Sequence, residues 1–336
     1  MFHRWRLSDL AITIRDVAKE AGVSVATVSR VINDSGYAHE DTRKVVLEAV
    51  NKLNYKPNEV ARSLFKRKSK LIGLILPDIT NPFFPALARG VEDYLQKEGY
   101  RVIFGNSDEQ LEKEMDYVDT FKQNNVVGII ASINETDSEM LSELSIPLVL
   151  LDRTIEALPS VYADQEQGGR LAAEKVLERG SKEITIVRGP KNVKNVYQRF
   201  EASYEVLKEA GVKVNILDSN LSFNGAKERA IELFQKYPQT DGVLACNDIV
   251  GVAILNEAQR IGKRIPEDVQ VIGFDDISIS ELVYPGLSTI HQPAYEMGAK
   301  AAEILIKKIN QEKLLNIHYK LAVSFVERKS TRKIGK

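Results

Sequence analysis

The sequence predicts an α/β protein in two parts: a small all-α helix-turn-helix headpiece, then a large core of two similar α/β lobes. Two short amphipathic helices joined by a glycine occupy residues 13–33. From Leu71, apolar strand-like runs alternate with helical segments, and the alternation restarts after about residue 163. Residues 1–70 carry 14 Lys and Arg against 8 Asp and Glu, whereas the other 266 residues carry 32 against 39. This division of charge indicates a polyanionic partner for the N-terminal part only.

The first two helices have clear start and stop signals. Thr13 is expected to cap a first helix, and Gly22 ends it because glycine adopts the left-handed conformation without a side-chain clash. Ser24 is expected to cap a second helix that runs from Val25 to Asn33. Two short helices joined in this way form a helix-turn-helix, whose second helix enters the major groove of DNA. An ordinary helix-helix corner in an all-α domain is the alternative.

A third helix and a short fourth segment complete the headpiece. The third helix is expected from Asp41 to Leu53, before Pro57, which restricts the residue ahead of it and lacks a backbone donor. Residues 58–66 have the spacing of a short amphipathic helix. A helix of this length is marginal alone in water, so a flexible basic linker is the alternative.

The core is expected to form doubly wound parallel sheets with right-handed crossovers. Strands are expected at LIGLILPDI, RVIFGNSD, VVGIIAS, PLVLLDR, EITIVRG, VKVNIL, GVLACND, VQVIGFDD and, as one C-terminal strand, YKLAVSFVERKS. Helices are expected at 83–97, 110–124, 137–144, 166–178, 195–210, 222–236, 249–261 and 294–310.

Composition indicates a cytoplasmic protein. The single cysteine, Cys246, excludes an internal disulfide and fits a reducing compartment; it follows an apolar run and is expected to be buried. Apolar runs of about 18 residues are absent, so no membrane span is expected. Residues 1–12 are too short and too charged for a secretory signal and are expected to be an N-terminal extension, native or not.

Candidate binding residues follow the strands, because ligands of doubly wound sheets bind beyond the carboxyl ends of the strands. Two lobes that face each other would bring both sets of strand ends to one cleft. The candidates are Asn81, Phe83, Phe84, Asp152, Arg153, Arg199, Phe223, Asn247, Asp275 and Gln292. Aromatic rings cover the weakly apolar faces of a sugar ring, and Asp, Arg, Asn and Gln bond its hydroxyls. The set therefore indicates a small sugar as ligand.

Packing or local hydrogen bonding would also explain some of these residues. Phe83 or Phe84 could belong to the core, and Asp152 could pair only with Arg153. Asp248 is a weaker candidate, because it could simply cap the next helix.

Enzymatic and metal-dependent functions find little support. The sequence has neither the phosphate loop GxxxxGK[ST] nor the nucleophile elbow GxSxG. Its four histidines are scattered without metal-ligand spacing. Asp275 and Asp276 form a carboxylate pair, but no activated nucleophile accompanies them. We therefore expect a binding protein without catalytic residues, cofactor or metal.

The headpiece resembles that of the LacI/GalR family of transcriptional regulators. The likeness rests on SVATVSRVIN, EDTRKVVLEAV, LNYKPN and VARSL at the separations found in the family. The two-lobed core resembles type I periplasmic sugar-binding proteins. The resemblance implies a DNA-binding domain over 13–57, a hinge helix and linker over 58–70, and a ligand-binding and dimerisation core over 71–336. Lobe one would comprise about 71–162 and 292–322, and lobe two about 163–291 and 323–336.

The resemblance also implies a homodimer on a palindromic operator. Val25, Ala26 and Arg30 occupy the family's base-reading positions, and Arg30 could bond a guanine bidentately. The family's hinge helix inserts a leucine into the minor groove, which by position is Leu64. The full set of expected DNA contacts is Thr13, Ser24, Val25, Ala26, Thr27, Ser29, Arg30, Asn33, Tyr55, Asn58, Ala61 and Leu64.

The candidate cleft residues resemble the pocket of the periplasmic ribose-binding protein, including its NPFF run and Asp-Arg pair. Within the LacI/GalR family, SGYAHEDTR, NEVARSLFKRKSKLIGLILPDITNPFFP and GNSDE resemble ribose operon repressors. These likenesses imply a repressor released from its operator by D-ribose or a close pentose. A co-repressor, a phosphorylated carrier protein as partner, a sugar receptor that does not bind DNA, a phosphorylated sugar and a tetramer stay open as alternatives.

Overall fold

The computed structural model describes residues 12–56, 69–133, 141, 144–220 and 223–334. The chain divides into two compact units, Met1–Ser69 and Lys70–Lys336. The expected N-terminal extension and hinge helix, and most of the helix expected at 137–144, lie outside the described residues.

The headpiece contains the helices α1 (Ile14–Ala21), α2 (Val25–Asn33) and α3 (Glu40–Lys52). The Asp16 carboxylate accepts hydrogen bonds from the backbone N–H and the hydroxyl of Thr13, at 2.8 and 2.7 Å, which fixes the start of α1. Gly22 ends α1 with φ of 63°. These bonds and the left-handed glycine confirm the expected helix-turn-helix.

Small apolar side chains form the core of the headpiece. Val17, Val28, Val31 and Val46 come from all three helices and are at most 3% exposed. The third helix begins and ends one residue earlier than expected, at Glu40 and Lys52. Packing of this small core therefore holds α2 in a defined orientation within the unit.

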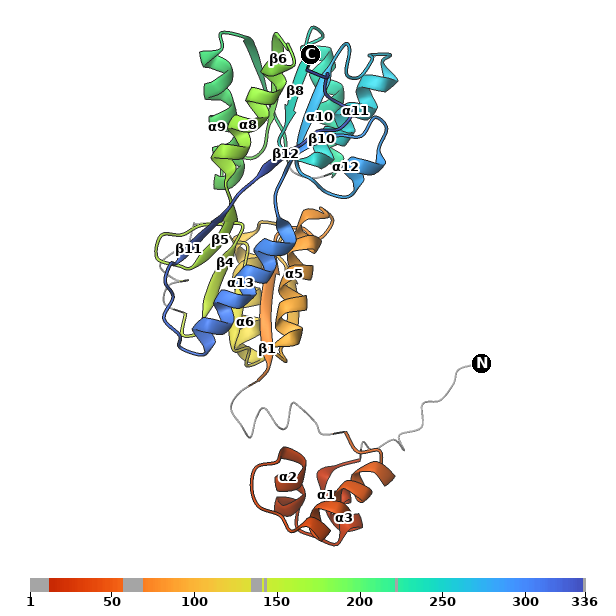
Figure 1. Ribbon diagram of the computed structural model, residues 1–336, viewed down its shortest axis with the longest axis vertical. Helices are drawn as coiled ribbons and strands as arrows, with labels where there is room; N and C mark the ends of the chain where they lie inside the picture. The colour runs from red at the N-terminus through yellow and green to blue at the C-terminus, as the bar shows by residue number, and fades with distance from the viewer. Residues whose placement is uncertain (1–11, 57–68, 134–140, 142–143, 221–222, 335–336) are drawn as a thin grey trace, which may run out of the picture. The chain divides into compact units, whose positions relative to one another are not determined.

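The core unit contains two sheets (Figure 1). Their strand order is the same. The first sheet, in lobe one, runs β11-β5-β4-β3-β1-β2, with β1 (Leu71–Leu76), β2 (Arg101–Asn106), β3 (Gly128–Ala131), β4 (Leu148–Leu151), β5 (Ser160–Ala163) and β11 (His318–Leu321). The second, in lobe two, runs β12-β10-β9-β8-β6-β7, with β6 (Glu183–Arg188), β7 (Lys213–Asp218), β8 (Gly242–Ala245), β9 (Gln270–Asp275), β10 (Ser288–His291) and β12 (Ser324–Val326). All neighbours are parallel except β10 and β12.

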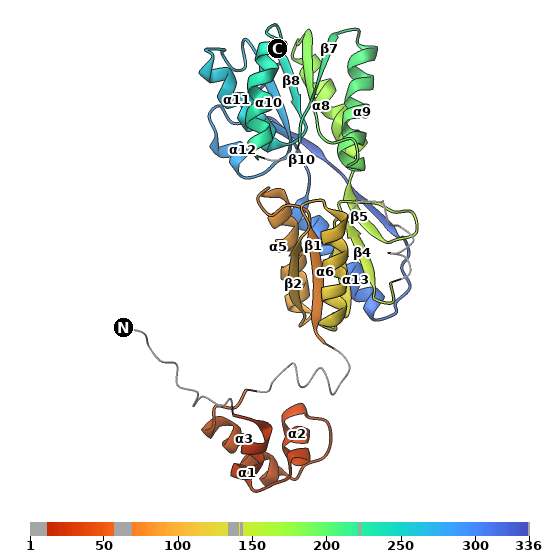
Figure 2. The same ribbon diagram turned by 180° about the vertical axis from the view of Figure 1, so that it is seen from behind.

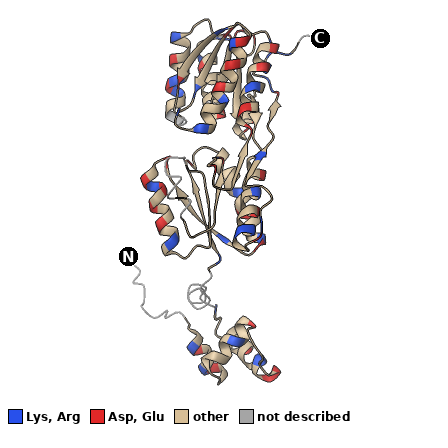
Figure 3. Ribbon diagram, turned by 90° about the vertical axis from the view of Figure 1, so that its left-hand side faces the viewer, with Lys and Arg blue, Asp and Glu red and all other residues tan. Residues whose placement is uncertain are grey.

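Helices cover both faces of each sheet, as Figure 2 shows from behind. In lobe one, α5 (Phe83–Lys97) and α13 (Ala294–Ile309) pack on one face and α6 (Leu111–Gln123) on the other. In lobe two, the layers are α8 (Gln165–Glu178) with α9 (Lys194–Glu209), and α10 (Phe223–Lys236) with α11 (Asp248–Arg260). Acidic and basic residues are interspersed along these helices (Figure 3).

The predictions for the core need correction in two respects: the omitted short elements and the C-terminal strand. The strands β5 and β10 and the short helix α12 (Ile279–Leu282) were not predicted, because they are four residues long and lack the continuous apolar run that marks β3, β4 and β8. The single C-terminal strand expected at YKLAVSFVERKS is two strands, β11 and β12, in different sheets. The chain passes between lobes at Ala322 and Val323, so neither sheet can pair the whole run.

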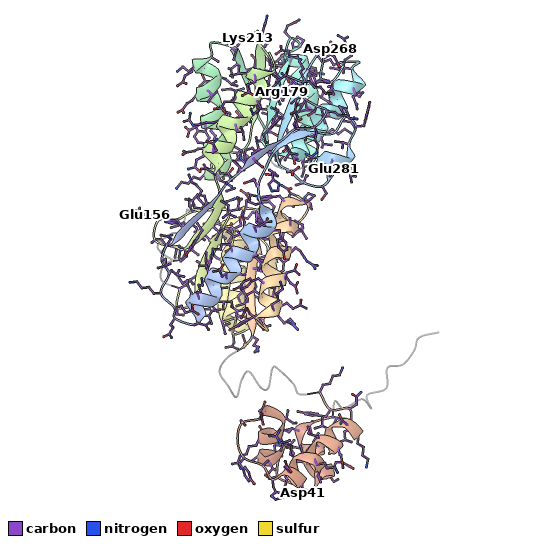
Figure 4. All side chains as sticks on the ribbon, viewed as in Figure 1. Asp41, Glu156, Arg179, Lys213, Asp268 and Glu281 are labelled. Atoms are coloured by element: carbon purple, nitrogen blue, oxygen red, sulfur yellow. The ribbon has the colours of Figure 1, made fainter. Side chains whose placement is uncertain are left out.

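The lobes are connected by three passages of the chain: between β5 and α8, between β10 and α13, and between β11 and β12. The amino ends of the lobe-two strands lie away from lobe one, where Figure 4 shows Lys213 at the start of β7 and Asp268 just before β9. The carboxyl ends of those strands therefore face lobe one. No helix in the described part of the chain is long and apolar enough to cross a membrane.

Candidate sugar-binding cleft and nucleic-acid interface

The carboxyl ends of both sheets enclose a cavity with about 320 Å³ of space, part of it open to solvent. We call this cavity the ring chamber. Its lining is Asn81, Phe83, Phe84, Asp152, Arg153, Asn195, Val196, Arg199, Cys246, Asn247, Asp275 and Gln292. The structure thus brings together nine of the ten candidate residues. The tenth, Phe223, begins α10, and its side chain is outside the described part.

Two phenylalanines form the apolar wall on the lobe-one side. The rings of Phe83 and Phe84 meet edge to face, with centroids 5.4 Å apart and planes at 74°. Asn81 Oδ1 accepts from the Phe83 backbone N–H at 3.1 Å, which orders the turn into α5. Both rings are buried in the lobe-one core and line the chamber. Phe83 and Phe84 therefore combine the core role and the lining role that the sequence had presented as alternatives.

Asp152 connects the two lobes. It follows β4 with φ of 59°, a left-handed backbone conformation that aspartate adopts more readily than most other non-glycine residues. Its Oδ2 accepts from Arg153 Nη1 at 2.6 Å and, across the cleft, from Asn195 Nδ2 at 3.0 Å. Arg153 also donates to Glu109 at 3.1 Å. The Asp152–Arg153 pair therefore exists, but it is part of a wider network.

Arg199 is the central cation of lobe two. Its Nη1 donates to the Cys246 carbonyl at 2.9 Å and lies 3.7 Å from Asp275 Oδ1. The guanidinium carbon lies 3.8 Å from the centroid of the Phe274 ring, a cation–π contact. These contacts hold a buried guanidinium in one orientation on α9, so Arg199 is part of the cleft and not of the solvent-exposed face of its helix.

A chain of side-chain amides ends at Asp275. Gln165 Nε2 donates to Gln292 Oε1 at 2.7 Å, and Gln292 Nε2 donates to Asp275 Oδ1 at 2.7 Å. Asn247 caps α11, because its Oδ1 accepts from the Val250 backbone N–H at 2.9 Å. Asn247 lines the ring chamber, and its amide nitrogen is buried without a partner among the described residues.

Burial dominates the electrostatics of the cleft. It raises the pKa of Asp152, opposed by the charges of Arg153 and Arg199. It raises the pKa of Asp275 well above the ordinary value, again opposed by Arg199, and lowers the pKa of Arg199 itself. Burial also raises the pKa of the Cys246 thiol to about 12, so this cysteine is an unreactive, buried residue, as expected.

One prediction about lobe two is corrected, and two residues of the network were missed. Asp248 does not cap α11, since Asn247 does; its carboxylate instead accepts from Thr289 Oγ1 at 2.5 Å and Ser280 Oγ at 2.8 Å, outside the lining of the ring chamber. Asn195 was missed, although it lies in the first turn of the helix after β6, closer to the strand end than Arg199. Gln165 was missed too, because it follows β5, which the sequence had not revealed.

The headpiece presents the residues expected to meet DNA bases on one helix. Val25, Ala26 and Arg30 are exposed on α2. Ser24 Oγ accepts from the Thr27 backbone N–H at 3.1 Å and therefore acts as a cap. Of the other expected contacts, Thr13, Ser29, Asn33 and Tyr55 lie in the described part of the headpiece, whereas Asn58, Ala61 and Leu64 lie outside it.

These two sites define a class of protein, one that couples a helix-turn-helix to a two-lobed small-molecule receptor. Residues 13–58 match the model of the lacI family of bacterial regulatory proteins, and residues 173–331 match a periplasmic binding protein-like domain. The chain belongs to the lacI family of bacterial regulatory proteins.

Particular relatives share nearly the whole chain. The ribose operon repressor of Bacillus subtilis (strain 168) is 54% identical over 96% of this chain and 99% of its own length. A ribose operon repressor of Halalkalibacterium halodurans is 41% identical over 95% and 97%. A LacI family transcriptional regulator from Enterococcus faecium, solved with bound ribose, is 33% identical over 78% of this chain and 98% of its own, with TM-score 0.70.

The fold as a whole matches the Lac repressor dimer solved with operator and the anti-inducer ONPF. That structure is 24% identical over 96% of this chain and 99% of its own, with TM-score 0.87.

Proposed function

We propose that this protein represses transcription of an operon for ribose uptake or catabolism and that D-ribose in the ring chamber releases it from DNA. The DNA-binding unit is assigned to 13–57, the hinge to 58–70 and the effector-binding core to 71–336. Several relatives named ribose operon repressor, which share 41–54% identity and nearly all of their length, support this assignment.

One observation carries the choice of ligand chemistry. Four buried polar atoms of residues that line the ring chamber lack a hydrogen-bond partner among the described residues: Asp152 Oδ1, Asn195 Oδ1, Arg199 Nε and Asn247 Nδ2. Two of these atoms are acceptors and two are donors. Each such atom costs about 1–3 kcal/mol when it is left unsatisfied. A ligand that both donates and accepts at several points is therefore favoured.

A pentose fits this pattern. Each sugar hydroxyl donates one hydrogen bond and accepts others, so it can pair with a carboxylate on one side and a guanidinium or amide on the other. Phe83 and Phe84 provide an apolar wall for a ring face. The proposed binding residues are the ten candidates named from the sequence together with Asn195. Asp152 and Asp275 disfavour a phosphorylated sugar, because their carboxylates would repel its charge.

DNA recognition is assigned to α2. We assign base contacts to Val25, Ala26 and Arg30, with phosphate contacts from the hydroxyl and amide side chains around them and hinge contacts from Asn58, Ala61 and Leu64. A homodimer would place two copies of α2 on the two halves of a palindrome. Such a regulator acts where the DNA is, in the cytoplasm.

Release follows from a difference in sugar affinity between two arrangements of the lobes. Asp152 belongs to lobe one, and Arg199, Asn247 and Asp275 to lobe two, so a bound sugar joins the lobes. If the closed lobes disfavour the DNA-bound arrangement, operator affinity falls by the same factor by which sugar affinity differs between the states.

Calorimetry combined with an operator gel shift tests the proposal. We expect D-ribose to bind the purified protein and to weaken its binding to palindromic DNA. Ribose that binds and tightens DNA binding would instead identify a co-repressor. Failure to bind ribose while DNA binding persists would remove the effector assignment, and DNA binding that requires a phosphorylated carrier protein would contradict direct control by sugar.

A further inference from the structure

A second cavity adjoins the ring chamber. We call it the side chamber; it has about 460 Å³ of space, part of it open to solvent. Asp152, Arg153 and Asn195 line both chambers and form the partition between them. Asn192 and Lys194 are exposed and mark the mouth of the side chamber, whereas Gln165 is only 3% exposed and marks its interior. The side chamber therefore runs from solvent to the edge of the proposed sugar site.

The chemistry of Gln165 is fixed by the chain of amides to which it belongs. The Asp275 carboxylate accepts from Gln292 Nε2 at 2.7 Å, so Gln292 must turn its oxygen toward Gln165. That oxygen accepts from Gln165 Nε2 at 2.7 Å. Gln165 Oε1 therefore faces the other way, and it is buried with no partner among the described residues. Gln165 lines the side chamber, and the side-chain atom that it leaves without a partner is an acceptor, not a donor.

The partition presents the same kind of atom. Asn195 Nδ2 donates to Asp152 at two points, to Oδ2 at 3.0 Å and to the carbonyl oxygen at 3.2 Å. Its own Oδ1 is thereby turned away from Asp152 and is buried without a partner in the described part of the core, as is Asp152 Oδ1. The unpartnered buried atoms of the side-chamber lining are thus three oxygens, all of them acceptors. Asp152 and Asn195 line both chambers, so Gln165 Oε1 is the one of the three that belongs to the side chamber alone.

We propose that the side chamber is a second subsite, which binds a hydroxyl-bearing extension of the sugar through Gln165, Asn195 and Asp152. The inference rests on the proposed function, because it requires the sugar ring to occupy the ring chamber. A hydroxyl donates to these oxygens, whereas a methyl group leaves them unsatisfied. A phosphate places negative oxygens against these acceptor lone pairs and beside Asp152. Of the two cations in the lining, Arg153 already pairs with Asp152 and Glu109, and Lys194 lies at the exposed mouth.

Sugars that extend ribose by one carbon at either end test the subsite. D-Allose keeps the ring stereochemistry of D-ribopyranose and adds a hydroxymethyl group at C5; D-psicose adds one at the anomeric carbon. We expect calorimetry to show that one of the two binds the full-length protein. Its deoxy analogue, 6-deoxy-D-allose or 1-deoxy-D-psicose, is expected to bind roughly tenfold more weakly, the effect of one hydrogen bond to a buried acceptor.

The variant Gln165→Met tests whether Gln165 accepts the hydrogen bond from the added hydroxyl of the sugar. Gln165 also orients Gln292, so the variant can weaken every sugar; the informative quantity is the difference between the hydroxymethyl sugar and its deoxy analogue. We expect that difference to shrink from roughly tenfold to about twofold or less in Gln165→Met. The matched control is Gln167→Met, an exposed position on the same helix, which should leave the difference unchanged.

The possible outcomes separate the two proposals. Binding of D-ribose without either extended sugar would overturn the subsite and leave the proposed function standing. Equal affinity for hydroxymethyl and deoxy sugars, or a difference that Gln165→Met does not reduce, would overturn it as well and indicate a chamber filled by water. Tighter binding of D-allose 6-phosphate than of D-allose would show an anion site instead. If the unmodified protein does not bind D-ribose, both proposals are wrong.

Discussion

Arg199 is the residue on which most of the cleft contacts converge. It bonds the Cys246 carbonyl, lies beside Asp275 and stacks on Phe274, and its Nε remains for a ligand. A planar guanidinium can satisfy all of these contacts at once, because its donors are fixed in one plane. A lysine carries the same charge on a single nitrogen and cannot stack in the same way.

We therefore expect Arg199→Lys to weaken D-ribose binding by roughly ten- to a hundredfold, the effect of about 1.5–3 kcal/mol for a hydrogen bond to a charged group. Binding to DNA without sugar should persist. The control is Arg188→Lys, which also removes a cation–π contact, with Phe200, and an ion pair, with Asp218, but lies outside the ring chamber. Calorimetry decides, and an equal loss in both variants would contradict a specific role for Arg199.

Asp248 gives the molecule a dependence on pH that is separate from sugar binding. Burial raises its pKa to about 7, well above the ordinary 3.8. Between these values the folded protein holds a proton that the unfolded chain has released. The stability contributed by that proton is complete below pH 3.8 and is lost as the pH rises through 7.

The variant Asp248→Asn should flatten this dependence, because an amide does not titrate. We expect the free energy of unfolding, measured with denaturant, to fall less between about pH 5 and 8 in Asp248→Asn than in the unmodified protein. Asp268→Asn is the control: ion pairing with Arg264 lowers the pKa of Asp268 to about 2, so its contribution changes only below that range. If the free energy of unfolding of Asp248→Asn falls with pH as steeply as that of the unmodified protein, another group is responsible for the dependence.

At the scale of elements, close contact between α8 and α9 positions Arg199. A Cβ atom on Gly169 of α8 would lie 2.2 Å from the backbone oxygen of Arg199 on α9. Such a contact is far inside van der Waals distance, so a side chain at this position must push the two helices apart. The glycine therefore allows α9 to hold Arg199 against β8 and β9.

We expect Gly169→Ala to destabilise the core by about 1–3 kcal/mol, the usual cost of overpacking, and to weaken ribose binding through displacement of Arg199. Arg170→Ala serves as the control, because Arg170 joins the same two helices through an exposed ion pair with Glu205, and such pairs contribute about 0–1 kcal/mol. Thermal unfolding and calorimetry on both variants give the answer. If Gly169→Ala is destabilised but binds D-ribose with unchanged affinity, the contact between α8 and α9 contributes to stability and not to the position of Arg199.

Element prediction succeeded where the sequence carried start and stop signals. Thr13, Gly22 and Ser24 fix the ends of α1 and the start of α2, and the observed α2 has the expected bounds. The helix expected at 83–97 also has its expected bounds. Short strands such as β5 and β10 were missed because pairing with neighbours, rather than their own pattern, makes them strands.

At the scale of the whole molecule, the chain divides into units with separate cores. The headpiece packs around Val17 and Val28, whereas the core unit has its own apolar clusters in both lobes. All residues that line the ring chamber belong to Lys70–Lys336. Sugar binding should therefore not require the headpiece.

We expect a fragment of residues 70–336 to fold and to bind D-ribose within about twofold of the full-length affinity while losing DNA binding. At a ribose concentration about a hundred times the dissociation constant, the fragment should gain about 2.7 kcal/mol of stability. Calorimetry and thermal unfolding of the fragment and the full chain make the comparison. A fragment that folds but binds ribose far more weakly would show that the headpiece influences the cleft.

The sequence alone determined the order of the units, most of the helices, and nine of the ring-chamber residues, because caps, hydrophobic periods and strand-end positions are local features that can be read along the chain. Only the tertiary structure decided that Asn195 meets Asp152 across the lobes, that Gln165 belongs to the chain of amides ending at Asp275, and that Asn247 rather than Asp248 caps α11. Contacts between residues far apart in the chain depend on how the lobes pack, and packing leaves no period in the sequence.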